Sequence, residues 1–168
     1  MDLPSSQDQS NRIQELVKTL KLESHPEGGF YSETYRSTEK AENNKGVLMT
    51  SIYFLLTSEN VSNFHKISHD ELWFHHEGSP IAIHSLENGK HKEFILGKSF
   101  KDSCKPQHLV KGSTIFGSAV LEPNSFALVS CVVSPGFEFK DFELFSYDQL
   151  ISEFPDSKEI IERLTPSS

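Results

Sequence analysis

The sequence is short of cysteine, of clustered basic residues and of long apolar runs, and each shortage excludes a class of protein. Only two of the 168 residues are cysteines, so a disulfide framework or a cysteine-rich zinc cluster is not expected. Cys131 lies in the apolar run FALVSCVV and is expected in the core. The 16 Lys and Arg residues are outnumbered by 24 Asp and Glu residues, which gives a net charge of −8. Without a basic patch to neutralise phosphates, we expect no nucleic-acid partner and no membrane partner.

The same shortages bear on location and domain organisation. No apolar run has the length that a bilayer requires, and the first ten residues, MDLPSSQDQS, contain no apolar segment of a targeting signal. We therefore expect a cytoplasmic protein. The hydrophobic content of 36% and the aromatic content of 11% are typical of a folded chain of one domain. We expect a flexible N-terminal tail at 1–10 and a single domain at 11–165.

Patterns along the chain predict an all-β domain with a helix at each end. The segment NRIQELVKTLKL has apolar residues at helical spacing. After it come short runs rich in Phe, Tyr, Val, Ile and Thr, separated by Gly, Pro, Asn and Ser, which predict a sandwich or barrel of mostly antiparallel strands. The C-terminal segment SYDQLISEFPDSKEIIERLT predicts two short helices, the second with Asp156 as its N-cap.

The stretch HPEGG, between the first helix and the first strand, predicts a turn. Gly28 and Gly29 supply the positive φ angles that such a turn needs, and Pro26 stops the approach of the helix. We interpret these three residues as structural.

The segment from Asn63 to Gly78, NFHKISHDELWFHHEG, is the best candidate for a functional site because it holds four of the eight histidines and the single tryptophan. In a strand, Glu71, Trp73 and His75 share one face. Aromatic residues on both faces indicate that both are covered, which allows a partly hidden pair of carboxylate and imidazole with shifted pKa values. The alternative is that these polar groups meet water at the end of a barrel.

The order of motifs resembles a known family. HPEGGFYSETYRS, SIYFLL, FHKISHDELWFHHEG, VSPGFEFKDFEL and the final FP…IIERLT occur in the order found in an uncharacterised cupin-like family, cupin type 5, and the resemblance runs from about residue 11 to residue 165. It implies a double-stranded β-helix, or jelly roll, whose interior can hold a ligand. It also implies a homodimer or an oligomer of dimers.

The cupin resemblance suggests where a metal would bind. Metal-binding cupins carry two histidines separated by one residue, then a glutamate and a glycine, with a third histidine on a later strand. Here His65 and Glu71 match two of these ligands, Ile67 stands at the second histidine, and Phe116 lies near the third. His69 would have to substitute, so a divalent metal on His65, His69 and Glu71 is the alternative to a site without a cofactor.

A second resemblance, of fold and chemistry only, is to sugar-nucleotide epimerases, jelly-roll proteins that use a histidine base and a tyrosine acid. By that analogy His65 is the base, held by Glu71 or Asp70, and Tyr53 or Tyr35 is the acid.

Eight further positions are candidate ligand-binding residues: Glu33, Tyr35, Arg36, Trp73, His75, Phe116, Phe137 and Glu143. Arg36 can grip a carboxylate or phosphate with its planar fork, or pair internally with Glu33 or Glu143. Trp73 and Phe137 are expected as walls of the pocket or of the core.

Three functions follow from these residues. The preferred hypothesis is a small-molecule-binding protein that is a metal-free acid–base enzyme of the epimerase or isomerase kind, acting on a small polar metabolite. The first alternative is a metal-dependent, oxygenase-like cupin enzyme that uses His65, His69 and Glu71. The second alternative is a binding protein without catalytic activity.

Overall fold

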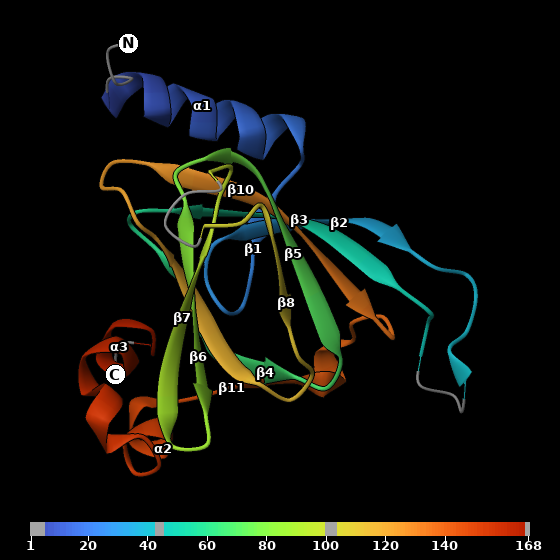
Figure 1. Ribbon diagram of the computed structural model, residues 1–168. Helices are drawn as coiled ribbons and strands as arrows, with labels where there is room; N and C mark the ends of the chain where they lie inside the picture. The colour runs from blue at the N-terminus through green and yellow to red at the C-terminus, as the bar shows by residue number, and fades with distance from the viewer. Residues whose placement is uncertain (1–5, 43–45, 100–103, 167–168) are drawn as a thin grey trace.

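Two antiparallel β-sheets face each other and enclose the main cluster of buried apolar side chains (Figure 1). The structure, a computed structural model, describes residues 6–42, 46–99 and 104–166. One helix lies across the outside of the first sheet, and the C-terminal helices lie beside the second (Figure 1). The predicted all-β jelly roll with an N-terminal helix and short C-terminal helices is confirmed.

The sheets contain six and five strands. The first has the order β1 (Glu23–Ser24), β2 (Phe30–Arg36), β3 (Thr50–Thr57), β10 (Phe126–Ser134), β5 (Asp70–Gly78) and β8 (Gln107–Val110). The second has the order β11 (Phe142–Leu144), β4 (Val61–Ile67), β9 (Ile115–Val120), β6 (Ile81–Glu87) and β7 (Lys90–Leu96). Some neighbouring strands are far apart in the sequence, as β10 between β3 and β5 illustrates, so the site is assembled from distant segments.

Alternating side chains on the central strands fill the space between the sheets. On β3, Phe54 and Leu56 point inward and are buried in the main core. They meet Trp73 from β5 and Val129 from β10 in the same cluster. Cys131 is also buried there, which confirms its expected place in the core. This packed half of the interior forms the floor of the site described below.

The N-terminal helix α1 (Ser6–Thr19) covers the outer face of the first sheet. Its apolar stripe, which includes Leu16, packs against Leu55 and Leu128. Arg12 adds a bidentate ion pair to Glu77 on β5, with Nε and Nη2 at 2.7 and 2.8 Å from the two carboxylate oxygens. The helix begins at Ser6 rather than at the predicted residue 11, and an acidic residue in its first turn suits the helix dipole. The expected flexible tail at 1–10 is therefore helical from residue 6, and residues 1–5 lie outside the described part of the chain.

The C-terminal elements cover the outer face of the second sheet. They are α2 (Tyr147–Ile151), η3 (Pro155–Ser157) and α3 (Lys158–Arg163), whereas η2 (Phe139–Asp141) lies at the cavity described below. Leu150 and Ile161 pack with Phe64 of β4 and Leu86 of β6. The prediction of Asp156 as the N-cap is wrong by one residue. Asp156 lies within η3, and the N-cap of α3 is Ser157. In the described part of the chain, no helix combines the length and apolar character needed to span a membrane.

Candidate functional site

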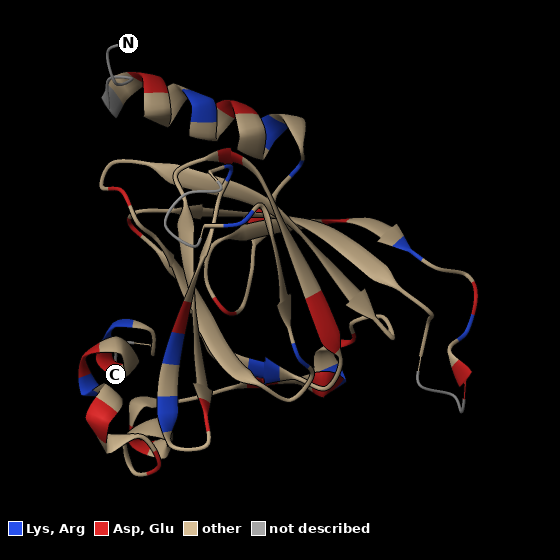
Figure 2. Ribbon diagram, viewed as in Figure 1, with Lys and Arg blue, Asp and Glu red and all other residues tan. Residues whose placement is uncertain are grey.

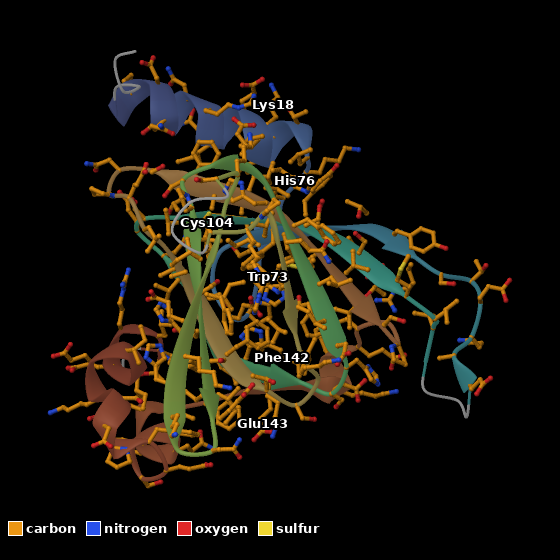
Figure 3. The ribbon with its side chains drawn as sticks, in the orientation of Figure 1. Lys18, Trp73, His76, Cys104, Phe142 and Glu143 are labelled. Atoms are coloured by element: carbon orange, nitrogen blue, oxygen red, sulfur yellow. The ribbon has the colours of Figure 1, made fainter. Side chains whose placement is uncertain are left out.

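A cavity of about 480 Å³ opens between the two sheets at the end nearest the start of β5. Its walls come from β1, β2, β3, β5 and β10 of the first sheet, from β4 of the second, and from the segment around η2. The floor is aromatic: the rings of Phe54 and Phe116 meet that of Trp73 edge-on at 5.8 and 6.2 Å. Trp73 lies between the sheets, whereas His76 lies toward α1 (Figure 3).

The turn at HPEGG places a carboxylate in this cavity. Gly28 and Gly29 have φ angles of +108° and +73°, as predicted. At Gly28 a Cβ atom would lie 2.0 Å from the carbonyl oxygen of Val61, so only glycine lets the turn approach β4 this closely. The backbone and side-chain amides of Asn63 each donate to the Glu27 carbonyl at 2.8 Å. These contacts fix Glu27 against β4.

The carboxylate of Glu27 meets the imidazole of His65. Oε2 of Glu27 lies 3.1 Å from Nε2 of His65, and both side chains are almost fully buried. The hydroxyl of Ser62 donates to Oε1 at 2.8 Å. The Nδ1 atom of His65 lies 2.7 Å from the carbonyl oxygen of Asn63 and must donate to it, because a carbonyl only accepts.

The hydrogen bonds determine how many protons this pair holds. With Nδ1 protonated, a neutral imidazole turns its Nε2 lone pair toward the Glu27 carboxylate, so the contact requires one more proton between Nε2 and Oε2. Burial lowers the pKa of His65 and raises the pKa of Glu27, and both shifts favour the uncharged form of the pair. A neutral pair with one proton between Oε2 of Glu27 and Nε2 of His65 satisfies these hydrogen bonds.

An irregularity in β4 explains why two of its residues reach the same carboxylate. Ser62 pairs with Ser118 and His65 pairs with Phe116, so one strand uses one residue more than the other between these points. In a regular strand, positions 62 and 65 face opposite sides of the sheet. The bulge turns both toward Glu27.

Glu71 is the second buried carboxyl group of the cavity. It is 7% exposed, and no hydrogen bond to a basic side chain neutralises it among the described residues. Burial first, and the nearby carboxyl group of Glu27 second, raise its pKa to about 7. Its neighbours on the floor are Trp73 and Cys131, and burial raises the thiol pKa of Cys131 well above the ordinary value. Glu71 thus changes its charge near neutral pH.

His25 and Tyr31 also line the cavity, with ring centroids 4.6 Å apart. The Nδ1 atom of His25 accepts a hydrogen bond from the Glu27 amide at 3.2 Å and lies 3.5 Å from Oε2 of Glu27. Burial lowers the pKa of His25. The sequence analysis did not predict His25, Glu27 or Tyr31 as site residues. The stretch HPEGG was interpreted only as a turn, although its histidine and its glutamate could have indicated a functional role.

The structure brings together some of the predicted catalytic residues and separates others. His65 and Glu71 both line the cavity, although Glu27 rather than Glu71 holds the imidazole. The prediction that Tyr53 is the catalytic acid is wrong. Tyr53 lies on the opposite face of β3 from Phe54, against α1, with its ring 6.0 Å from that of His76. Asp70 binds Lys111 and the amide of Gly112 at the surface instead of His65.

Among the predicted ligand-binding residues, four line the cavity: Glu33, Arg36, Trp73 and Phe137. Phe116 is fully buried with its ring 4.3 Å from that of His65, so it supports the imidazole from behind. His75 shares the inner face with Trp73, but it lies beyond the aromatic floor and contacts the carbonyl of Ser79 at 2.9 Å.

Two predicted ligand-binding residues face away from the cavity. Tyr35 is 49% exposed on β2, where the register with β3 shifts between Glu33 and Tyr35. Glu143 forms an ion pair with Lys66 at 2.8 Å on the outside and lies at the far end of the molecule from α1 (Figure 3). The prediction that Tyr35 and Glu143 bind a ligand is therefore wrong, because neither side chain faces the cavity.

The proposed metal set is not assembled. His69 lies in the turn that leads from β4 in the second sheet to β5 in the first, outside the residues that line the cavity. Within residues 6–42, 46–99 and 104–166, no three His, Cys, Asp or Glu side chains converge to hold a metal ion. The ring of Phe116 stands beside His65, near the position where the cupin resemblance puts the third histidine.

Comparison with known proteins identifies the family. The model of the family described as "Cupin superfamily (DUF985)" matches residues 14–145. The uncharacterized protein YML079W of Saccharomyces cerevisiae is 30% identical over 146 residues, which are 77% of this chain and 73% of that protein.

Two solved structures are similar to this chain in their fold. Protein SO0799 from Shewanella oneidensis superposes with a TM-score of 0.87 and 40% identity over 92% of this chain and 98% of its own. A cupin-like protein from Thermotoga maritima, at 9% identity, shares the fold with a TM-score of 0.51 over 88% of this chain and 90% of its own. The chain belongs to the DUF985 family of the cupin superfamily.

Proposed function

We propose that this chain is an acid–base enzyme of the isomerase or epimerase kind, which moves a proton on a small polar metabolite held between the sheets. The observation that carries the proposal is the meeting of two kinds of proton carrier in one cavity: the Glu27–His65 pair, at 3.1 Å, and the separate carboxyl of Glu71. Isomerisation next to a carbonyl requires one group to remove a proton and another to supply one.

The protonation states assign the two roles. The Glu27–His65 pair holds one proton and is the acid. Glu71, with a pKa of about 7, is ionised in a large fraction of molecules at neutral pH and is the base. This reverses the sequence-based hypothesis, in which His65 was the base and a tyrosine the acid. The aromatic floor keeps water away from the far side of both groups.

The reaction begins when a bound carbonyl compound places its acidic C–H bond at Glu71. The carboxylate takes the proton while the electrons of the C–H bond move toward the carbonyl oxygen, and the Glu27–His65 pair donates its proton to the forming enolate oxygen. When the deprotonated carbon bears a hydroxyl group, the intermediate is an enediol. Glu71 returns its proton to the former carbonyl carbon while that hydroxyl group gives its proton to the Glu27–His65 pair, so the carbonyl group moves to the neighbouring carbon and the starting charges are restored.

The test is exchange of substrate protons with solvent. Small aldoses, ketoses and amino ketones are incubated with the protein in deuterium oxide, and NMR follows the loss of the proton next to the carbonyl. We expect exchange whose rate rises with pH through about 7 as Glu71 ionises. Glu71→Gln and His65→Asn should each slow it by about two orders of magnitude or more.

A matched control is His76→Asn, which changes a half-exposed histidine on the outer face of the same strand and should leave the rate unchanged. The assay is repeated after treatment with a chelator. Exchange that is lost with the chelator and restored by a divalent metal would contradict the proposal in favour of a metal-dependent enzyme. Compounds that bind without any exchange would favour a binding protein.

A further inference from the structure

The mouth of the cavity combines aromatic rings with acidic side chains. Phe137 and Phe139 meet edge-on with centroids 5.1 Å apart, and Phe139 is 54% exposed although it is a large apolar side chain. Tyr31 adds a third ring on the side of β2. Exposed apolar patches with a polar rim are found at ligand-binding grooves and interaction sites.

The side chains that line the cavity carry more acidic than basic groups. The described residues that line the cavity include five glutamates, which are Glu23, Glu27, Glu33, Glu71 and Glu138, whereas Arg36 is the single Lys or Arg among them. Figure 2 shows part of this pattern as the acidic start of β5.

The guanidinium of Arg36 is already occupied. Its Nε and Nη2 atoms bind the two carboxylate oxygens of Glu33 at 2.9 and 2.7 Å, and Nη2 also donates to the carbonyl of Phe137 at 3.2 Å. The sequence-based hypothesis that Arg36 grips a ligand phosphate or carboxylate therefore requires this bidentate pair to break.

Not all of these glutamates have a basic partner. Glu33 is paired with Arg36, and Glu138 is paired with Lys140 at 2.6 Å. Glu27 shares a proton with His65. Glu23 at the mouth accepts a hydrogen bond from the Tyr31 hydroxyl, but neither Glu23 nor Glu71 at the floor has an ion pair with a basic side chain among the described residues. An anionic ligand would enter a cavity with excess negative charge, and a cationic one would be attracted.

A buried donor shows that the interior is also built for a polar ligand. Trp73 is 1% exposed, and its Nε1 atom lacks a hydrogen-bond partner of good geometry, although it lies near enough to Glu71 to lower that carboxyl pKa. Buried indole N–H groups usually have a partner. An oxygen atom of a ligand in the cavity would supply one.

We infer that the mouth of this cavity recognises the cationic group of the ligand, a protonated or quaternary amine, which lies against Phe139, Phe137 and Tyr31 and is balanced by Glu23. Aromatic faces attract cations, and carboxylates beside them add to the attraction. The oxygen-bearing end of the same molecule points to Trp73 and Glu71. This inference deepens the proposed function and rests on the same cavity: it selects amine-bearing substrates and rejects phosphorylated ones.

The test compares probes of similar size and shape that carry different charges. Choline, its uncharged isostere dimethylbutanol and the anion dimethylbutanoate form one set; benzylamine, benzyl alcohol and benzoate form another. Dissociation constants are measured by ligand-observed NMR at pH 7.5 and low salt. We expect the cation to bind most tightly in both sets, by about tenfold over the neutral member, and the anion least.

Variants at the mouth identify the site. Glu23→Gln and Phe139→Ala change exposed side chains and should each weaken choline binding by about threefold to tenfold. Arg36→Gln should strengthen it, because Glu33 is then unpaired. Glu122→Gln, an exposed acidic residue outside the cavity, is the control and should have no effect.

Three outcomes would overturn the inference: anions that bind as tightly as cations, anion binding that is lost in Arg36→Gln, or cations that bind no more tightly than their neutral partners. The result is independent of turnover. Cation selection that persists in His65→Asn, without deuterium exchange in the wild type, would uphold this inference while the proposed enzymatic function fails.

Discussion

Oε2 of Glu27 lies 3.1 Å from Nε2 of His65, and the second imidazole nitrogen is fixed by the backbone carbonyl of Asn63. The pair comes from a turn before the first long strand and from the middle of β4. Since burial disfavours both charged forms, the pair is stable as a neutral unit and is poised to release a proton to a ligand.

Replacing Glu27 by Gln tests the shared proton. The amide nitrogen can still donate to Nε2 of His65, so we expect the free energy of unfolding to change by no more than about 1 kcal/mol. The amide cannot release that proton, so solvent exchange of a substrate should slow by about two orders of magnitude. Urea denaturation and the NMR exchange assay measure the two effects. An active Glu27→Gln protein would show that the proton of this pair is not used.

The pH dependence of stability tests Glu71. Its pKa rises from an ordinary value of 4.5 to about 7 on folding, so the native state binds more protons than the unfolded state between these pH values. The free energy of unfolding should therefore fall as pH rises through this window, and the full penalty, about 3 kcal/mol, should be present above it. Below the window Glu71 is neutral in both states and contributes nothing.

The matching variant is Glu71→Gln, which removes the titration. We expect its stability to exceed that of the wild type above pH 7, with a flatter profile at lower pH. Chemical denaturation at a series of pH values measures both proteins. Parallel profiles for the two would mean that Glu71 does not titrate in this range.

Gly28→Ala tests the turn that carries Glu27. The new Cβ atom would meet the carbonyl oxygen of Val61 at 2.0 Å, and φ is +108°, so we expect a loss of about 3 kcal/mol or more. Gly89→Ala is the control: φ is +72° but no atom lies within 4 Å, so the loss should be near 1 kcal/mol. Equal losses in thermal or urea melts would show that the close approach to β4 is not required.

Cys131 should resist alkylation in the native protein. The thiol is buried beside Glu71, and burial first and the charge of Glu71 second raise its pKa well above the ordinary value. Because only the thiolate reacts, iodoacetamide should modify Cys131 at least about a hundredfold more slowly than a free cysteine at pH 7.5. Mass spectrometry of peptides after timed quenching measures the rate. Rapid modification without denaturant would mean that the cavity floor opens to solvent.

The sequence by itself determined the local features of this protein. Alternation along β5 placed Glu71 and Trp73 on one face, because successive side chains of a strand point to opposite sides. Glycines at 28 and 29 indicated a turn with positive φ, which the structure has. The apolar spacing around Leu16 predicted the N-terminal helix, although not its start at Ser6.

Only the tertiary structure decided which of these residues meet. Glu27 reaches His65 because Gly28 lets the turn approach β4 and because a bulge in β4 rotates His65 inward, and neither event has a local signature in the strand pattern. Tyr53 was predicted to face the substrate, but its position on β3 turns it toward α1. The sequence specifies the faces of each strand, whereas the pairing of distant strands decides which side chains share a cavity.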